Sequence, residues 1–405
     1  MLNAVSSRNA VDVVVAGAGP AGAMAARLLA RAGLRVVLCD KAAFPRDKTC
    51  GDALIPDSIA ALRHADAWNR VSERARSLDL LEVLSPRGIS VPIRGEYRVL
   101  RRREFDAMMF EDAVAAGAEF RQVAVRRPIE TTAGQVAGVV VERDGREEEI
   151  RAPLTVLATG ADGAVLRRFD AAARTTASGY AIRTYAVRAA SSSPDDRLFI
   201  SLERDLLPGY AWAFPGPDNV FNVGVGVFYA SRLRERKLNL RQRLDRLMSG
   251  QGRLGRILGP MKLAGGDVRY AGAPLRTGLT GSSLGRAGLA IVGDAAGTTY
   301  GLTGEGIGKS MESGQLVAEL AMAGSRDLPA VGELYRVEMH RRYVGRFRTY
   351  QTAERWMRVP AFADLVAHRA NRSPWVLKHL TSVLTEDTLP DRVFSAKALW
   401  ALLTR

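Results

Sequence analysis

Residues 11–41 read VDVVVAGAGPAGAMAARLLARAGLRVVLCDK, a pattern that predicts a β-strand, a tight turn, an α-helix and a second strand. The run Val13–Val15 is β-branched, as in strands that are buried on both faces of a parallel sheet. Gly17, Gly19 and Gly22 follow with the G-x-G-x-x-G spacing of a dinucleotide-binding turn. The first glycine permits the sharp turn, the second lets a pyrophosphate approach the backbone, and the third lets helix and strand pack closely.

The helix after this turn is expected to begin at Pro20–Ala21, where free N–H groups and the positive dipole end attract phosphate. Asp40 ends the second strand about 20 residues beyond the glycines, where an acidic side chain binds ribose hydroxyls, and Lys41 follows it. The order of strand, turn, helix and acid therefore predicts a dinucleotide site. A secretory signal peptide is the alternative, but Arg27 and Arg31 within the segment argue against it.

The composition is that of a globular protein with an unusual excess of positive charge. The chain has 405 residues, of which 47% are hydrophobic and 25% charged, and its formal net charge is +15. An arginine-rich genome or attraction to an anionic membrane or substrate would explain this charge; no recognition motif supports a nucleic-acid partner. Two cysteines and no secretion signal predict a cytoplasmic location. We also expect no membrane-spanning helix and no metal site.

Buried-strand patterns return twice along the chain, each followed by a turn that contains glycine and an acid. Leu154–Leu157 precedes the turn Gly160–Asp162, and Leu289–Val292 precedes Gly293–Asp294. Doubly wound sheets bind ligands at the carboxyl ends of their strands. The three turns therefore predict one ligand-binding edge.

The segment between the second and third of these strands has a different character. Residues 180–187, 197–202, 209–214 and 220–228 have the pattern of antiparallel strands, and 231–258 is predicted helical. A long helix is expected from about Gly304 to Ala323. The sequence thus predicts an α/β fold, with a doubly wound, Rossmann-like nucleotide-binding domain, an inserted antiparallel-sheet substrate domain and a helical C-terminal region. We expect the nucleotide-binding domain to comprise 1–79, 101–173 and 285–330, the substrate domain 80–100 (a hairpin) and 174–284, and the C-terminal region 331–405.

Further segments carry a family resemblance. The chain from residue 10 to about 330 resembles flavoproteins with the para-hydroxybenzoate hydroxylase fold, and among them the geranylgeranyl reductase family. The loop Phe44–Gly51 (FPRDKTCG) is similar to the family's P-x-x-K-x-C-G loop beside the flavin. Arg103–Asp106 resembles a helix start whose arginine reaches FAD, and Tyr210–Pro215 (YAWAFP) resembles the Y-x-W-x-F-P strand of the substrate domain. The run Thr303–Ile307 is similar to the T-G-E-G-I segment that follows the G-D motif.

The resemblance implies that the three turns hold one FAD molecule, with Asp40 at the adenosine end and Asp294 at the ribityl chain. Backbone N–H groups of the Leu302–Ile307 loop are expected to stabilise negative charge on a reduced flavin. One departure is Gly301, where many relatives have proline. The implied FAD-binding residues are Gly17, Gly19, Pro20, Ala21, Gly22, Asp40, Lys41, Arg46, Lys48, Cys50, Gly51, Arg103, Gly160, Asp162, Gly293, Asp294, Gly304, Glu305, Gly306 and Ile307.

The same resemblance implies a reductase that saturates carbon–carbon double bonds of an isoprenoid or other apolar substrate. NAD(P)H or another reductant is expected to dock transiently, because the chain has no second G-x-G-x-x-G. Cys50 is the candidate proton donor, with a bound water or a merely structural thiol as alternatives. Tyr210, Trp212 and Phe214 are expected to line the substrate pocket or to fill the core between sheets. We expect the Tyr210 hydroxyl to be free to hydrogen-bond substrate.

The sequence is also compatible with other functions. The same fold carries flavin-dependent monooxygenases, which hydroxylate or epoxidise, and halogenases, although the halogenase W-x-W-x-I-P pattern is absent. A non-catalytic prenyl-binding protein is a further alternative. The basic and aromatic stretch 341–358 has the composition of a membrane-surface helix, but a packed cap or a partner interface would have the same pattern.

Overall fold

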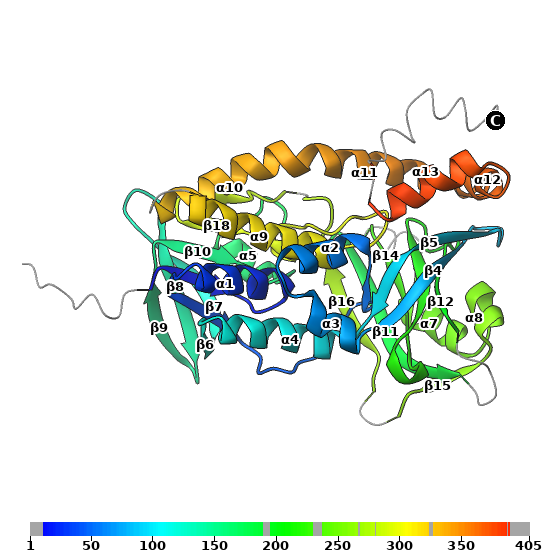
Figure 1. The fold of residues 1–405 in the computed structure, drawn as a ribbon, viewed down its shortest axis with the longest axis horizontal. Helices are drawn as coiled ribbons and strands as arrows, with labels where there is room; N and C mark the ends of the chain where they lie inside the picture. Colours follow the sequence, from blue (N-terminus) through cyan, green and yellow to red (C-terminus); the bar gives the residue numbers. More distant parts are fainter. Residues whose placement is uncertain are drawn as a thin grey trace, which may run out of the picture.

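The opening motif forms the centre of a six-stranded sheet (Figure 1). We describe the protein from a computed structural model, which covers residues 11–188, 195–229, 237–265, 268–279, 281–323, 327–386 and 388. The strands of this sheet, in spatial order, are β17 (Gly285–Arg286), β18 (Leu289–Ile291), β10 (Leu154–Leu157), β1 (Val13–Ala16), β2 (Val36–Asp40) and β6 (Glu119–Gln122). All neighbouring pairs are parallel except β17 with β18.

Helices and a small sheet cover the six-stranded sheet, so that all four residues of β1 are buried. Helix α1 (Pro20–Arg31) lies between α4 (Arg102–Ala115) and α9 (Ile307–Ala323). The approach of α1 to α9 is close, because a Cβ atom on Gly314 would lie 2.3 Å from the carbonyl oxygen of Ala21. The small sheet shares the same apolar core and consists of β7 (Ala124–Glu130), β8 (Val136–Arg143) and β9 (Arg146–Arg151).

A second large sheet contains the predicted hairpin together with the strands of the inserted segment. Its strands pair antiparallel, except β12 with β4, which is parallel. In spatial order they are β15 (Met261–Leu263), β11 (Gly179–Arg188), β14 (Phe221–Val227), β13 (Gly209–Pro215), β12 (Arg197–Ser201), β4 (Arg76–Leu84), β5 (Ser90–Val99) and β3 (Ala53–Leu54), with β16 (Ala271–Leu275) beside β11. The predicted α/β fold with an antiparallel insertion is therefore confirmed.

Two predicted helices are shorter than expected. The segment predicted helical over 231–258 contains α7 (Leu240–Met248) and α8 (Gly252–Leu258), and residues 231–236 lie outside the described residues. Gly250, with φ of +76°, separates α7 from α8. Helix α9 begins at Ile307 rather than at Gly304, because Gly304 has φ of +72°, which no right-handed helix accommodates.

The C-terminal region is helical as predicted, up to Leu384. Helix α10 (Val331–Met339), a π-helical segment η4 (His340–Val344) and α11 (Gly345–Met357) follow one another as a single long rod (Figure 1). Helices α12 (Pro360–Ala370) and α13 (Pro374–Leu384) then pack on the second sheet. The remaining elements are α2 (Pro56–His64), α3 (Trp68–Arg74), α5 (Gly163–Arg168), η1 (Pro217–Asn219), η2 (Gly293–Ala295) and η3 (Leu328–Ala330). None of the helices in the described part of the chain combines the length and apolar character that a bilayer crossing needs.

Candidate active site

A cavity of about 720 Å³ lies at the carboxyl ends of β1, β2, β10 and β18 and continues over the second sheet. Its size is within the range of about 300–1,000 Å³ that is usual for small-molecule sites. All the residues predicted to bind FAD or substrate line this cavity, except Gly22 and Arg103. The structure thus brings together three turns that are distant in the sequence.

The first turn forms an anion-binding cradle at the start of α1. Gly17 has φ of +108°, and Gly19 caps the helix in extended conformation without any side-chain hydrogen bond to its free N–H groups. A Cβ atom on Gly19 would have the guanidinium of Arg46 as its nearest neighbour, at 3.5 Å. Nη1 of Arg46 is buried 3.0 Å from Asp106 but makes no hydrogen bond to any described residue. Free N–H groups beside a guanidinium fit a pyrophosphate.

Asp40 lies at the edge of the same cradle. Its two carboxylate oxygens accept the N–H groups of Ala18 at 2.8 Å and Ala42 at 2.9 Å, which fixes the orientation of the side chain. Lys41 forms a long, exposed ion pair of 3.5 Å with Asp162, which also caps helix α5. The first and second turns therefore meet at the position expected for the adenosine end of FAD.

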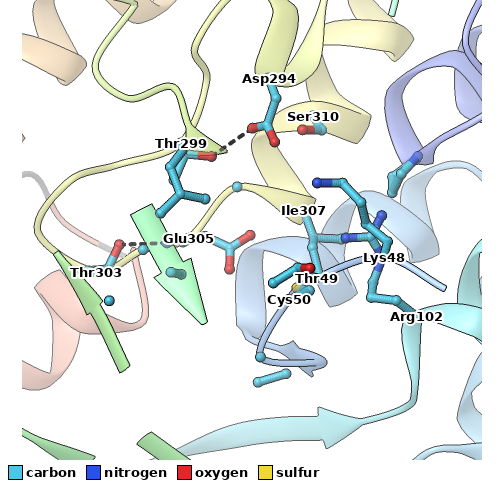
Figure 2. A pocket seen from close by; sticks show the side chains of 18 of the residues that line it. Lys48, Thr49, Cys50, Arg102, Asp294, Thr299, Thr303, Glu305, Ile307 and Ser310 are labelled. Carbon is cyan, nitrogen blue, oxygen red and sulfur yellow. Dashed lines mark hydrogen bonds between the residues drawn. The ribbon is translucent and has the colours of Figure 1, made fainter. Parts of the chain in front are cut away.

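The third turn lies beside the first, since a Cβ atom on Gly293 would lie 2.9 Å from the Cβ atom of Ala21. Figure 2 shows its Asp294 in the cavity wall. Asp294 follows β18 and accepts a hydrogen bond from the Thr299 hydroxyl at 2.9 Å. The loop that precedes α9 is held by Tyr210, whose hydroxyl donates to the carbonyl oxygen of Thr303 at 2.7 Å. The prediction that this hydroxyl is free for substrate is therefore wrong, because Tyr210 positions the loop. Gly304 has to be glycine here, since a Cβ atom would lie 2.1 Å from that hydroxyl oxygen.

The arginine beside the cavity is Arg102, and not Arg103 as predicted. Arg103 is exposed and lies outside the cavity wall, whereas Arg102 is buried and bonds Asp106 through two contacts of 2.6 and 2.8 Å. One step along a helix turns a side chain by about 100°, so a shift of one residue exchanged the buried and exposed positions. Burial alone would lower the pKa of Arg102, but the charges of Asp106 and Cys50 outweigh it and raise that pKa above its ordinary value.

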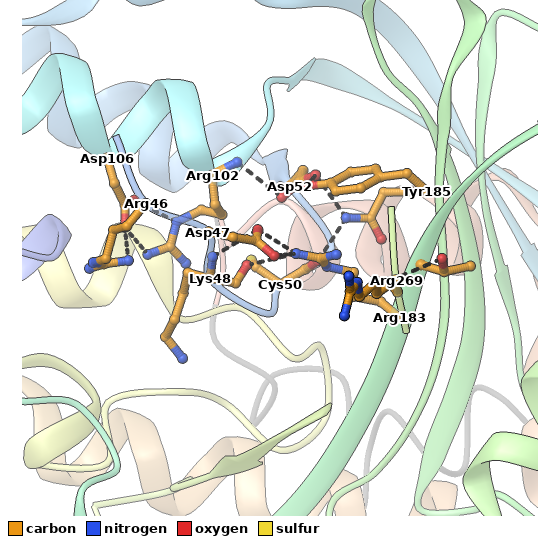
Figure 3. A network of polar contacts seen from close by, with 12 residues as sticks. Arg46, Asp47, Lys48, Cys50, Asp52, Arg102, Asp106, Arg183, Tyr185 and Arg269 are labelled. Atoms are coloured by element: carbon orange, nitrogen blue, oxygen red, sulfur yellow. Dashed lines mark hydrogen bonds and ion pairs between the residues drawn. The ribbon is translucent and has the colours of Figure 1, made fainter. Parts of the chain in front are cut away.

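A buried polar network attaches the Phe44–Gly51 loop to the second sheet (Figure 3). Asp52 accepts hydrogen bonds from the Tyr185 hydroxyl and the Asn222 amide, each at 2.8 Å. Asn222 also donates to the carbonyl oxygen of Cys50 at 2.7 Å, and Arg183 bonds Asp47 at 2.6 Å. Burial raises the pKa of Asp52 to about 6, although its hydrogen bonds oppose the shift. This network fixes the position of Cys50 in the cavity wall.

The far half of the cavity is apolar. Trp212 and Phe214 line it from β13, and Trp212 is fixed by a hydrogen bond of 2.9 Å from its indole N–H to Asn222. Helices α12 and α13 form the opposite wall with Val366, Leu380 and other aliphatic residues. The predicted substrate-pocket residues therefore lie between the three glycine-containing turns and the C-terminal helices.

The C-terminal region thus acts as a packed cap over the cavity. Phe347 and Tyr350 of the basic and aromatic stretch are buried, and Tyr350 stacks on Tyr300 with ring centroids 4.0 Å apart. Arg346 pairs at 3.0 Å with Glu386, which follows α13. Two of the aromatic side chains that suggested a membrane helix are used in this packing, as is Arg346, whereas Arg348 and Arg355 stay exposed.

Comparison with known proteins agrees with this geometry. Residues 10–201 match a family model described as an FAD binding domain. A menaquinone reductase of Mycobacterium tuberculosis is 33% identical over 340 residues, which cover 80% of this chain and 79% of that protein. Digeranylgeranylglycerophospholipid reductase 1 of Methanopyrus kandleri is 30% identical over 325 residues, with 77% and 80% covered.

Solved structures show the same fold at low sequence identity. A geranylgeranyl bacteriochlorophyll reductase-like protein from Thermoplasma acidophilum superimposes with a TM-score of 0.74 at 21% identity, covering 97% of this chain and 96% of that one. A flavin-dependent brominase superimposes with a TM-score of 0.73 at 19% identity, with 98% of each chain covered. The cavity with its three glycine-containing turns and the extent of these sequence matches lead to the same family. The chain belongs to the geranylgeranyl reductase family of FAD-dependent oxidoreductases.

Proposed function

We propose that the protein reduces isolated carbon–carbon double bonds in the isoprenoid chain of an apolar lipid. The observation that carries this proposal is the continuity of one cavity, from the FAD-binding turns to an apolar chamber under α12 and α13. The named relatives support it, because menaquinone and digeranylgeranylglycerophospholipid have different head groups but share isoprenoid chains. The reported relatives at 30% identity or more are reductases, which favours reduction over oxygen-dependent hydroxylation or halogenation.

The chamber suits a long hydrocarbon chain. Aliphatic side chains of the second sheet form one of its walls, namely Leu81, Val83, Leu198 and Ile200. Leu384 of α13 lies on the opposite wall. Transfer of a chain from water to such a surface gains about 0.8 kcal/mol per buried CH₂. Apolar walls do not distinguish one polar head group from another. We therefore propose that the protein recognises the isoprenoid chain of the lipid.

We assign the cofactor by the same geometry. The Gly17–Gly22 turn and Arg46 would hold the pyrophosphate, Asp40 the adenosine ribose, Asp294 the ribityl chain, and the Gly304–Ile307 loop the flavin ring. A bound FAD, reduced by NAD(P)H or another donor, supplies hydride to the substrate. The chain's own residues orient the double bond, exclude water and supply a proton. We also propose that the two large sheets mark the separate FAD-binding and substrate domains expected from the sequence.

An anaerobic experiment tests the reaction. The holoenzyme is photoreduced without O₂ and mixed with a geranylgeranyl lipid that carries no quinone. We expect the flavin to reoxidise and the lipid to gain two hydrogen atoms, as measured by absorbance and mass spectrometry. Reoxidation only after O₂ is admitted would overturn the reductase assignment. If only menaquinone reoxidises the flavin and its isoprenoid side chain keeps its mass, the group that is reduced is the quinone ring and not the isoprenoid chain.

We further propose that the corner between α11 and α12 touches an anionic membrane surface, from which the lipid enters. Trp356 and Val359 are 43% and 51% exposed there, and Arg348 and Arg355 are exposed nearby. Met357, between the two apolar residues, lines the cavity. Exposed apolar side chains flanked by arginines beside a lipid-binding cavity suit an anionic bilayer.

Vesicle binding tests this contact. The double variant Trp356→Ser, Val359→Ser is expected to sediment with phosphatidylglycerol-containing vesicles about 30-fold more weakly, because each change removes about 1 kcal/mol of apolar insertion and the two together about 2 kcal/mol. Leu334→Ser, Val337→Ser is the matched control, since these residues are 44% and 52% exposed on α10. Equal loss in both variants, or no vesicle binding by the wild type, would contradict the proposed surface.

A further inference from the structure

A buried glutamate lies in the cavity wall close to Cys50. Glu305 is 6% exposed and stands in the loop before α9, between two glycines. One of its carboxyl oxygens accepts the N–H group of Gly308 at 2.7 Å, which ties the side chain to the first turn of the helix. Figure 2 shows its carboxyl group directed into the cavity on the side of Cys50. The group is therefore oriented, desolvated and accessible to a ligand in the cavity.

The groups around Glu305 favour its neutral form. Burial, followed by the charge of Glu386, raises the pKa of Glu305 to about 8, and Cys50 acts in the same direction. Asp57 on α2 and Tyr210 on β13 also interact with it electrostatically. The nearest cation, Lys309 on α9, opposes the shift. It is engaged by three other carboxylates, at 2.6 Å to Glu312, 2.9 Å to Glu386 and 3.4 Å to Asp57. Burial and the neighbouring carboxylates therefore favour the neutral carboxylic acid form of Glu305.

Cys50 has the opposite surroundings. The Arg102 guanidinium lies beside its thiol, close enough that the charge of Cys50 contributes to the raised pKa of Arg102. A guanidinium only donates hydrogen bonds, so Arg102 engages the sulfur of Cys50 as an acceptor. Glu305 is thus the better placed of the two groups to deliver a proton to a substrate in this cavity.

We propose that Glu305 is the proton donor to the substrate double bond, in place of Cys50. This inference rests on the proposed function. In the step, the O–H bond of Glu305 breaks and a C–H bond forms at one alkene carbon, using the π electron pair. The other carbon receives hydride, which derives from a reduced nicotinamide or an equivalent donor. Glu305 is left as a carboxylate and regains its proton from water, so the lipid gains two hydrogen atoms in total.

Glu305→Gln is the decisive variant, because the amide keeps the size of the side chain and an oxygen for the Gly308 N–H group. We expect single-turnover lipid reduction to fall by about 100-fold or more, as on loss of a general acid, with FAD content unchanged. In the wild type the rate should be constant below about pH 8 and fall above it, since the acid must be protonated. Cys50→Ala should keep this pH dependence. If Glu305→Gln retains the wild-type rate, or Cys50→Ala removes the alkaline fall, the assignment is wrong.

An infrared measurement on the oxidised holoenzyme tests the proton independently of turnover. The wild-type minus Glu305→Gln difference spectrum should contain the carbonyl band of an un-ionised carboxylic acid at pH 7, and this band should disappear above about pH 9. Glu354→Gln is the matched control: Glu354 is buried outside the cavity wall, and burial raises its pKa to about 7. That variant should lose its own band without losing activity. Absence of a Glu305 band refutes this inference alone, whereas a wild type that reduces no lipid refutes the proposed function.

Discussion

Replacing Lys309 with methionine is expected to lower the free energy of unfolding by about 3–5 kcal/mol, because it leaves buried carboxylates without their cation. Lys309 is 3% exposed and pairs with Asp57 on α2, Glu312 on its own helix α9 and Glu386 after α13. Arg346 still pairs with Glu386 in the variant, so the main cost falls on Asp57. The ammonium group therefore joins helices α2 and α9 to the residues that follow α13.

The loss should depend on pH. Burial, with the surrounding carboxyl groups, already raises the pKa of Asp57 above its ordinary value, and removal of Lys309 raises it further. A carboxyl group whose pKa is higher in the folded than in the unfolded state binds more protons when folded, so stability falls as pH rises between the two values. The Lys309→Met defect should accordingly be larger at pH 8 than at pH 5.

Chemical denaturation at both pH values measures this effect. Glu312→Gln is the control, because it removes the most exposed partner of Lys309 and should cost less than about 1 kcal/mol. A Lys309→Met protein that is as stable as the wild type would show that the ion cluster does not hold the cap. A defect that grows on acidification would show that the carboxylates are not the groups left unpaired.

Local patterns were sufficient to predict which strand ends come together at the cavity. Gly17, Gly19, Asp40 and Asp294 each belong to a short strand–turn segment, and such segments keep their geometry because a parallel sheet buries the strand and exposes the turn. The prediction of Arg103 was wrong because a local pattern does not fix which face of a helix is buried. The pattern located the start of α4, but the buried face of a helix depends on its phase, which is set by tertiary packing against α1.

The polar network around Cys50 had no signal in the sequence. Asp52 bonds Tyr185 and Asn222, which are 133 and 170 residues away, and the register of the second sheet alone brings them together. The basic and aromatic tail was ambiguous for a related reason, since a helix packed on its own protein has the same periodicity as one on a membrane. The structure resolves the ambiguity residue by residue: Tyr350 is buried against the protein, whereas Trp356 is exposed.

Gly301 illustrates how the cap shapes the flavin loop. At this position, where the family resemblance implied proline, a Cβ atom would lie 2.4 Å from a carboxyl oxygen of Glu354 on α11. A side chain at residue 301 would therefore displace the Glu354 carboxyl group, so the C-terminal region packs directly against this loop. This contact could be recognised only once both segments were placed in space.

Replacing Gly22 with alanine is expected to destabilise the apoprotein by about 3 kcal/mol or more and to abolish FAD binding. The added Cβ atom would lie 1.8 Å from the carbonyl oxygen of Gly17 and 3.1 Å from the Cβ atom of Ala158. Backbone cannot move aside as a flexible side chain does, so α1 has to shift away from β1 and the cradle opens. Chemical denaturation of the apoprotein and flavin absorbance after gel filtration measure the two effects.

Gly19→Ala separates this packing role from contact with the cofactor. A Cβ atom on Gly19 would meet only the Arg46 guanidinium, at an ordinary 3.5 Å, so the apoprotein should keep its stability within about 0.5 kcal/mol. The same methyl group would stand where the pyrophosphate approaches α1, and we expect FAD affinity to fall by about 100-fold, or about 2.7 kcal/mol. Retention of wild-type affinity by Gly19→Ala would place the pyrophosphate elsewhere. An apoprotein as stable as wild type in Gly22→Ala would show that α1 can move without cost, so the two variants test the cradle and its scaffold separately.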